Sequence, residues 1–232
     1  MKRKKKANYG QEMAMVLSML AILSIGSAFI GTWVAMSVKL SVIFYSVSAL
    51  LAMIVLIGIW SSRIGKLKLR DQIFDYVQLN GDEKLLDIGC GRGLLLIEAA
   101  KRLSNGKAIG ADHWKATPEY RYTSQMVIRN AEIEGVADRI EVINADAQAL
   151  PFDHESFDVV MTSLMMHHVA DKSKAIKEMV RVLKPKGMLI LADVGIHRFK
   201  DELAKAGITD VKIERSVRLF FMPVRILRAK KQ

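Results

Sequence analysis

The sequence predicts an α/β domain built on a mostly parallel, seven-stranded sheet and preceded by a pair of apolar helices. Two observations predict this organisation. From about residue 70 onward, short apolar runs alternate with helix-length segments, which is the pattern of parallel strands joined by crossover helices. Before that point the chain carries two long stretches without a charged residue. A chain of 232 residues has room for one such domain and an appendage.

The two uncharged stretches cover residues 13–36 and 40–60, and either can cross a hydrocarbon core of about 30 Å. Because only residues 37–39 separate them, we expect a tight antiparallel pair of transmembrane helices, that is, a transmembrane helical hairpin. Small residues recur at four-residue spacing in the first stretch, which lets a second helix approach closely: Ser27, Gly31 and Ala35. A cleaved signal peptide is one alternative, since residues 2–6 are all basic, and a buried hairpin in a soluble core is the other, although two uncharged stretches of this length are rare in soluble cores. The first stretch is longer than a signal h-region and the second follows directly, which favours the hairpin.

The formal net charge of +11 is concentrated at the two ends of the chain. Residues 1–70 contain ten Lys and Arg against one Glu, residues 211–232 contain seven against one Glu, and residues 71–210 contain 18 against 22 acidic residues. Basic ends beside apolar stretches favour membrane phospholipid over nucleic acid as a partner. A basic tail (1–12) and a basic linker (61–70) flank the hairpin, so we expect both flanks at the cytoplasmic face of the membrane.

The domain that follows, residues 71–232, is expected on the same side. Its predicted helices cover Leu69–Leu79, Leu94–Leu103, Ser124–Glu134 and Lys172–Leu183, the last ending at a Lys-Pro-Lys-Gly turn over residues 184–187. Its predicted strands alternate with these helices along the chain and cover Lys84–Ile88, Lys107–Asp112, Ile140–Ile143, Phe157–Thr162 and Met188–Ala192. Val211–Val217 and Val224–Ala229 are expected to close the sheet with an antiparallel β-hairpin.

A glycine loop follows the first predicted strand, with the sequence Asp-Ile-Gly-Cys-Gly-Arg-Gly over residues 87–93. Glycines let the backbone turn sharply and lie against a ligand, and the helix N-terminus beyond them favours a negative or acceptor group. The nicotinamide fingerprint would need a further glycine at position 94, where Leu94 stands. An acidic residue, Asp87, precedes the loop instead and can reach the ammonium group of a zwitterionic amino-acid ligand.

This combination resembles motif I of the class I S-adenosylmethionine-dependent methyltransferases. Four further segments follow in the order of that family: residues 110–112, 144–152, 157–168 and 182–187. The resemblance covers about residues 70–232 and is closest to the branch of quinone and small-molecule methyltransferases. It implies a Rossmann-like sheet of seven strands with a C-terminal antiparallel hairpin, and S-adenosylmethionine as the cofactor.

The resemblance also implies which residues bind the cofactor. Asp112 would accept hydrogen bonds from the ribose hydroxyls, and Asp146 would accept one from the adenine amine. The full predicted set is Asp87, Gly89, Cys90, Gly91, Gly93, Asp112, His113, Asp146, Ala147 and Ser163. Taken singly, each carboxylate could instead be an ordinary strand-end or turn residue. Cys90 is expected to be a small packing residue and not a nucleophile.

Catalysis is expected to need no general acid, because a sulfonium donor releases a neutral thioether. A base matters only where the acceptor is protonated. His168 is the first candidate for that base and His167 the second, and His113, beside the ribose carboxylate, is another candidate. The alternative for the adjacent pair is that one histidine packs against the sheet while the other shapes the pocket. No metal site is predicted, because the single Cys and five His have no zinc-ligand spacing.

Together these features predict a membrane-anchored methyltransferase that acts on a small-molecule or lipid-like acceptor at the cytoplasmic face. Anchoring raises the effective concentration of a membrane-borne acceptor. A non-catalytic membrane scaffold or sensor that binds the same cofactor is the alternative. Nucleic acid is disfavoured as the acceptor, because Ser-Leu-Met-Met over residues 163–166 replaces the Asn/Asp-Pro-Pro-aromatic motif of amino-type base methyltransferases.

Overall fold

The computed structural model describes residues 7, 14–33, 38–114, 124–219 and 222–232 of the chain. The chain divides into two compact units. One contains Leu69–Val217 and Pro223–Gln232, and the other contains Gly10–Lys68 and Arg218–Met222. The predicted basic tail over residues 1–12 lies outside the described residues, apart from residue 7.

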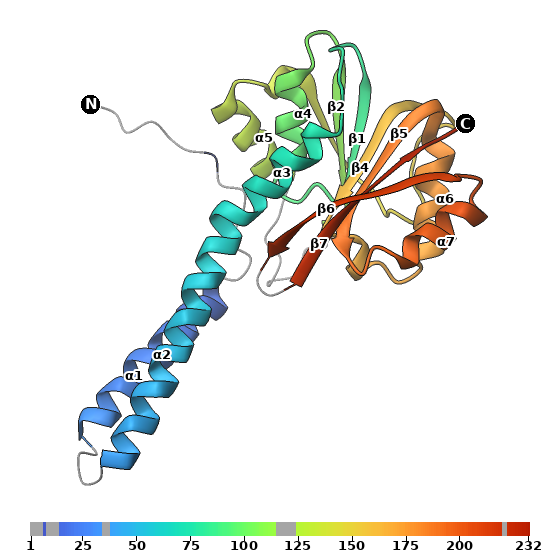
Figure 1. The fold of residues 1–232 in the computed structure, drawn as a ribbon. Helices are drawn as coiled ribbons and strands as arrows, with labels where there is room; N and C mark the ends of the chain where they lie inside the picture. The colour runs from blue at the N-terminus through green and yellow to red at the C-terminus, as the bar shows by residue number, and fades with distance from the viewer. Residues whose placement is uncertain (1–6, 8–13, 34–37, 115–123, 220–221) are drawn as a thin grey trace. The chain divides into compact units, whose positions relative to one another are not determined.

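The larger unit is built on the predicted seven-stranded sheet (Figure 1). Its strands follow the order β3-β2-β1-β4-β5-β7-β6 across the sheet. β1 to β5 pair in parallel, whereas β7 runs antiparallel to β5, as the sequence predicted. The bounds are β1 Lys84–Ile88, β2 Lys107–Asp112, β3 Ile140–Asn144, β4 Phe157–Ser163, β5 Leu183–Val194, β6 Asp210–Leu219 and β7 Met222–Lys230.

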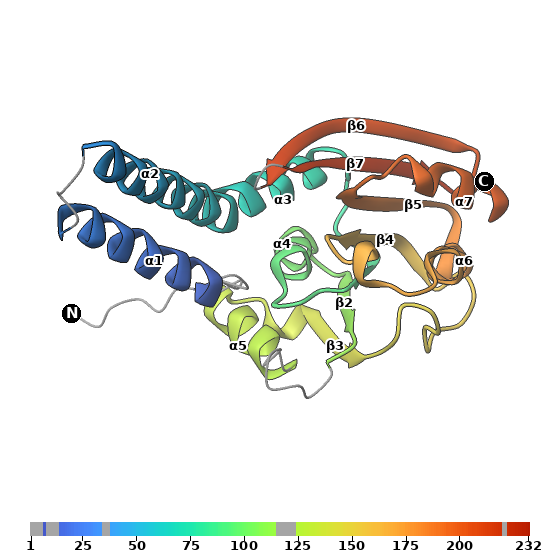
Figure 2. The same cartoon turned by 90° about the horizontal axis from the view of Figure 1, so that it is seen from below.

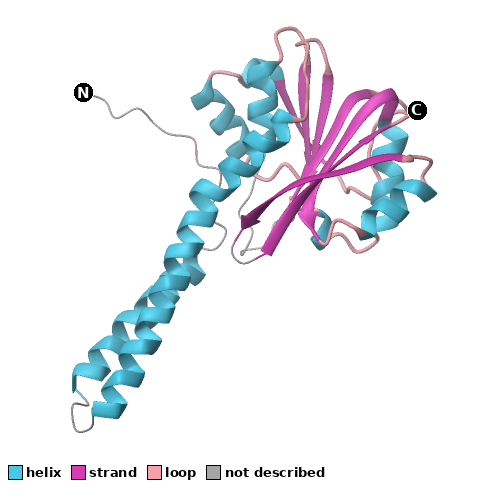
Figure 3. Cartoon of the chain, in the orientation of Figure 1, coloured by secondary structure: helices cyan, strands magenta, loops and turns pink. Residues whose placement is uncertain are grey.

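Helices cover both faces of this sheet, as parallel strands require (Figures 2 and 3). α4 (Leu94–Arg102) and α5 (Ser124–Glu134) lie on one side, and α6 (Lys172–Val182) and α7 (Arg198–Lys205) lie on the other. The short helices η2 (Ala137–Arg139) and η3 (Met166–His168) follow α5 and β4. The central strands are apolar on both faces because both faces are covered: in β1, Leu85 and Leu86 are fully buried.

Two local predictions needed correction, and one helix was missed. The helix predicted over residues 69–79 is α3, which runs over Lys66–Asp75, so the predicted linker over 61–70 is helical. α7 was not predicted, although its buried Phe199 and Leu203 have the four-residue spacing of a helix face. The predicted turn at residues 184–187 lies inside β5.

The turn signal in β5 produces a bulge instead of a strand boundary. Phe157 is in register with Leu183 and Val159 with Met188, so four residues of β5 stand opposite one residue of β4. Lys186 takes up the distortion with a positive φ of 63°. Pro and Gly therefore interrupt the hydrogen-bonded ladder locally. Beyond them β5 continues and pairs with β4 again from Met188.

The smaller unit contains two antiparallel apolar helices, α1 (Ala14–Trp33) and α2 (Val38–Trp60), close to the predicted 13–36 and 40–60. Serines join them: the Ser24 hydroxyl donates to the Ser48 carbonyl at 2.9 Å, and the Ser27 and Ser48 hydroxyls are 2.6 Å apart. A π-helical turn, η1 (Ser61–Gly65), links α2 to α3.

Length and hydropathy single out one described helical run as able to cross a membrane. This run is Ser41–Asp75, with a mean hydropathy of 2.6 in its most apolar window. The apolar part of α1, Val16–Ile30, is shorter. Many large apolar side chains of both helices are exposed within this unit, among them Ile22, Ile25, Phe29 and Leu56.

Candidate cofactor-binding site

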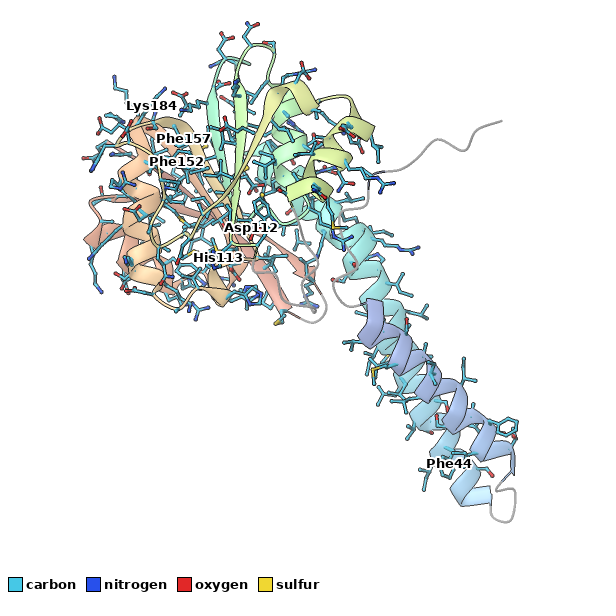
Figure 4. The ribbon with its side chains drawn as sticks, turned by 180° about the vertical axis from the view of Figure 1, so that it is seen from behind. Phe44, Asp112, His113, Phe152, Phe157 and Lys184 are labelled. Atoms are coloured by element: carbon cyan, nitrogen blue, oxygen red, sulfur yellow. The ribbon has the colours of Figure 1, made fainter. Side chains whose placement is uncertain are left out.

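The predicted cofactor residues lie at one edge of the sheet. Because β1 to β4 are parallel, their carboxyl ends meet there, and each is followed by one predicted segment. β1 leads into the glycine loop, β2 ends at Asp112, β3 leads to Asp146, and β4 ends at Ser163. Figure 4 shows Asp112 and His113 near one another at the carboxyl end of β2.

The three glycines of the loop all have backbone conformations that side-chain-bearing residues rarely adopt. Gly89, Gly91 and Gly93 have φ values of 73°, 56° and 84°. A Cβ on Gly89 would lie 2.3 Å from Met165 Cγ, so this glycine also lets the turn after β4 pack closely. A Cβ on Gly91 would meet nothing within 4 Å, so the space beside that residue is open.

Hydrogen bonds fix the loop to the end of β2. The amide of Gly89 donates to the Ala111 carbonyl at 2.7 Å, and the amide of Gly91 donates to Asp112 Oδ2 at 2.7 Å. Asn130, on α5, donates its side-chain amide to the Arg92 carbonyl at 3.0 Å. Sequence reasoning missed Asn130, because its partner is 38 positions away in the chain.

Asp87 is almost fully buried beneath the loop. Its Oδ2 accepts a hydrogen bond from the Leu96 amide at 3.0 Å, which satisfies one donor in the first turn of α4. Burial raises the pKa of this carboxyl from 3.8 to about 7, with a smaller contribution from the nearby Asp112 charge, while the Leu96 amide acts in the opposite direction. A cationic group beside Asp87 would offset this cost and favour the ionised carboxylate.

Cys90 is a packing residue in this structure, as expected. Its Sγ lies 2.9 Å from where a Cβ on Gly110 would stand, so the side chain occupies the space that this glycine leaves. Burial, with the charges of Asp87 and Asp112, raises the pKa of the thiol well above 9.0. A thiol held in the protonated form is a poor nucleophile.

Asp146 and Ala147 lie in a turn after β3. The Asp146 carboxylate accepts from the backbone amide of Gln148 at 2.8 Å, and this hydrogen bond lowers its pKa. The aromatic residue that ends this predicted motif, Phe152, has a different partner: its ring packs edge-on against Phe157, with centroids 4.8 Å apart. Phe152 and Phe157 lie well away from Asp112 in Figure 4, and the half-buried aromatic residue of this motif packs against the core.

An ion pair on α6 holds this segment in place. Arg181 donates to Glu178 Oε1 at 2.7 Å and to the carbonyls of Leu150 and Phe152, while Glu178 accepts from the Leu150 amide. The side-chain hydrogen bond from Arg181 lowers the pKa of Glu178. Sequence reasoning missed both residues, which pair three positions apart on one helix face.

The two histidines after β4 have different surroundings. The Nδ1 atom of His167 lies 3.0 Å from Asp193 Oδ1, and the His167 amide donates to Asp193 Oδ2 at 3.2 Å. Asp193 is 1% exposed, whereas the His167 side chain is 40% exposed. His168 is exposed, and its ring centroid lies 4.0 Å from that of His167. Asp193, at the end of β5, was missed by sequence reasoning.

These residues fit the cofactor that the resemblance implies. A buried carboxylate with a raised pKa suits an ammonium group, and an open space beside Gly91 lets a ligand lie against backbone. Beyond Asp112 and His113, the buried Trp114 Nε1 has no hydrogen-bond partner among the described residues. Acceptor groups on a bound nucleoside would satisfy such a donor.

Comparison with known proteins also points to a methyltransferase domain. Residues 86–191 match the family described as "Methyltransferase domain". Methyltransferase GfsG from Streptomyces halstedii is 29% identical over 139 residues, which cover 60% of this chain and 48% of that protein. The ubiquinone/menaquinone biosynthesis C-methyltransferase UbiE from Blochmanniella pennsylvanica is 32% identical over 117 residues, which cover 50% of this chain and 44% of that protein.

Among solved structures, an SAM-dependent methyltransferase from Aquifex aeolicus has the same fold. It superposes with a TM-score of 0.57 at 18% sequence identity, covering 70% of this chain and 89% of that one. The chain spans about half the length of the curated relatives it matches.

Proposed function

We propose that the chain contains a class I S-adenosylmethionine-dependent methyltransferase domain and methylates a small-molecule or lipid-like acceptor at the cytoplasmic face of a membrane. One observation carries the methyl-transfer part of the proposal. The glycine loop, the buried Asp87 and the strand-end Asp112 meet at a single edge, where Gly91 and Asp112 are already hydrogen-bonded.

Each residue has a defined part in holding the cofactor. When bound, S-adenosylmethionine supplies a methyl group on a sulfonium whose leaving group is a neutral thioether. Asp87 would pair with its ammonium group, Asp112 would accept from the ribose hydroxyls, and Asp146 would accept from the adenine amine. Gly91 would let the ligand approach the backbone. Because no acid is needed, orienting the acceptor supplies much of the rate.

Replacing Asp112 tests the ribose assignment. We expect Asp112→Ala to weaken cofactor binding by about 10- to 100-fold, the range for losing a hydrogen bond to a charged group. Asp112→Asn should lose less, because its amide oxygen can still accept from Gly91. Isothermal titration with S-adenosylmethionine measures the effect. Asp138→Ala is the matched control, since that carboxylate is 78% exposed and lies in η2. Equal affinities for the two alanine variants would refute the assignment.

We further propose that His167, held by Asp193, is the base for an acceptor that must lose a proton. A Nδ1–H donated to the buried Asp193 leaves Nε2 as the proton acceptor and stabilises the imidazolium that forms. His168 was the first candidate from sequence. The carboxylate partner in the structure supports His167 instead.

Paired variants distinguish the two histidines. We expect His167→Asn to lower kcat by about 10²- to 10⁴-fold, the usual contribution of a positioned base, with cofactor affinity unchanged. Asp193→Asn should lower kcat and shift the pH profile of kcat, and His168→Asn should leave that profile in place. Steady-state kinetics from pH 5 to 9 measures all three. A normal kcat in His167→Asn would assign the base elsewhere.

The membrane part of the proposal is supported by the smaller unit. Its two helices carry exposed apolar side chains, and serine hydrogen bonds join them into a hairpin. Basic residues follow the second apolar stretch, at Arg63, Lys66 and Lys68, and the Lys68 Nζ lies 5.6 Å from the Trp60 ring centroid. Trp and basic residues at the end of an apolar helix are typical of the cytoplasmic interface.

Transfer of a labelled methyl group tests the function directly. The purified full chain in detergent is incubated with methyl-labelled S-adenosylmethionine and total membrane extract, with Asp112→Ala as the control. We expect label in an extractable small molecule or lipid with the wild type only. A protein that binds the cofactor and labels nothing would be a cofactor-binding scaffold. Reporter fusions at the C-terminus test the orientation, and an external reporter would overturn it.

A further inference from the structure

A cluster of cationic side chains lies further along the same edge of the sheet. Asp193 on β5 and Arg225 on β7 are register partners in the antiparallel pair, so their side chains start from the same face. His167 reaches Asp193 from the turn after β4, and the Arg225 guanidinium contacts His197 Nε2. Arg198, at the start of α7, donates to the Val194 carbonyl at 3.3 Å.

The charges in this cluster are not balanced. The buried Asp193 accepts from the His167 ring, from the His167 amide and from the Val194 amide, so its oxygens are occupied. Arg225 and Arg198 are exposed, and neither has a carboxylate within ion-pair distance among the described residues. The Arg225 contact is to a ring nitrogen of His197 and not to a carboxylate, so it does not balance the guanidinium charge.

The cluster is separate from the proposed cofactor residues. In the strand order β3-β2-β1-β4-β5-β7-β6, Arg225 stands three strands away from the glycine loop after β1. At a spacing of about 4.8 Å per strand, this is about 14 Å along the edge. The candidate base His167 follows β4, between the two groups. Cofactor residues, base and cationic cluster thus follow one another along the edge.

We propose that Arg225, oriented by His197 and assisted by Arg198 at the Val194 carbonyl, binds a carboxylate or phosphate group on the methyl acceptor. A guanidinium presents a planar fork of donors that matches both anions. The assignment to the acceptor rests on the proposed function, since it takes the methylated atom to lie near His167. The binding of an anion by Arg225 does not depend on the proposed function.

Inorganic phosphate is the probe for the site itself. The full chain in detergent is titrated with phosphate while NMR follows the His197 ring resonance, assigned by comparison with His197→Gln. We expect saturable binding that weakens by about tenfold or more in Arg225→Met, the range for losing a charged hydrogen-bonding partner. Arg225→Lys should recover part of the affinity. Lys230→Met is the matched control, because it removes an exposed charge from the far end of β7.

Equal phosphate affinity in Arg225→Met and Lys230→Met would overturn the site, as would a His197 resonance that does not respond. Labelled product from membrane extract then tests the acceptor. We expect it to bind an anion exchanger, and Arg225→Met to raise the acceptor KM with cofactor affinity unchanged. Partition of the label into organic solvent identifies a lipid headgroup, and partition into water identifies a soluble anion.

Two negative results remain distinguishable. Label in a product without an anionic group, with a normal KM in Arg225→Met, would overturn the acceptor assignment while the methyltransferase stands. Arg225-dependent phosphate binding without any labelled product would count against the proposed function and in favour of the anion site.

Discussion

Asp87→Asn is expected to make the methyltransferase domain more stable at neutral pH while weakening its hold on the cofactor. The folded domain raises the pKa of Asp87 from 3.8 to about 7, chiefly by burial. Between these values the folded state keeps a proton that the unfolded chain releases, so the free energy of unfolding falls as pH rises. At 1.36 kcal/mol per pKa unit, the loss between pH 4 and pH 7 amounts to about 3 kcal/mol.

The asparagine variant carries no charge at this position, so that contribution disappears. We expect its free energy of unfolding to exceed that of the wild type by about 2–4 kcal/mol at pH 8 and to converge with it near pH 4. Its cofactor affinity should fall by about tenfold or more, because the ammonium group loses a charged partner. Hydrogen exchange of the β1 amides in urea, measured from pH 4 to pH 8, reports the domain separately from the helical hairpin.

Subtracting the two pH profiles removes the contributions of all other groups. A difference that stays flat between pH 4 and pH 8 would contradict the raised pKa. Saturating S-adenosylmethionine should reduce the difference at pH 8, since a bound ammonium group stabilises the ionised carboxylate. A cofactor that leaves the difference unchanged would mean that its ammonium lies elsewhere.

The second prediction separates two glycines that the sequence pattern treats alike. Gly89→Ala should destabilise the domain by about 2–5 kcal/mol, which combines the cost of a positive φ with that of overpacking. The clash is with Met165 Cγ and Cβ, at 2.3 and 2.6 Å. These atoms lie close to the Met165 backbone, so rotation of the flexible end of that side chain does not relieve it.

Gly91→Ala should cost only the strain of its positive φ, about 1–2 kcal/mol, because its new Cβ meets nothing. Its cofactor affinity should nevertheless fall by about tenfold or more, because the methyl group would enter the space assigned to the ligand. Urea unfolding and isothermal titration measure the two effects separately.

Gly207→Ala is the matched control for this comparison. Gly207 follows α7, has a φ of 88° and also has open space at the Cβ position. We expect it to share the stability cost of Gly91→Ala and to leave cofactor affinity unchanged. If Gly91→Ala bound the cofactor as tightly as Gly207→Ala, the ligand would not lie against Gly91.

The strands and the order of the motifs were predictable because they depend on local sequence. β1 and β2 have the predicted bounds, since an apolar run bordered by polar residues and glycine specifies a buried strand on its own. The positions of Asp87, Gly91 and Asp112 were predictable for a related reason. Parallel strands bring their carboxyl ends to one edge, so residues after successive strands meet whatever their distance in the chain.

The pairing of His167 with Asp193 and of Arg225 with His197, in contrast, was decided by the tertiary structure. His167 and Asp193 are 26 positions apart, and Arg225 and His197 are 28 apart, so no local periodicity links either pair. The register of β5 against β7 brings them together, and one residue of slip would turn Arg225 to the opposite face. The packing of Phe152 against the core was decided in the same way, by its contact with Phe157.

The glycine loop shows both levels in one segment. Its sequence determined a sharp turn, a helix start and a place for a ligand against the backbone, because glycine alone tolerates those dihedral angles. Only the folded chain decided that Gly89 makes room for Met165 while Gly91 faces open space, and that Asp87 is buried deeply enough to lose its charge near neutral pH. These properties depend on the neighbours that folding supplies, and those neighbours come from distant parts of the chain.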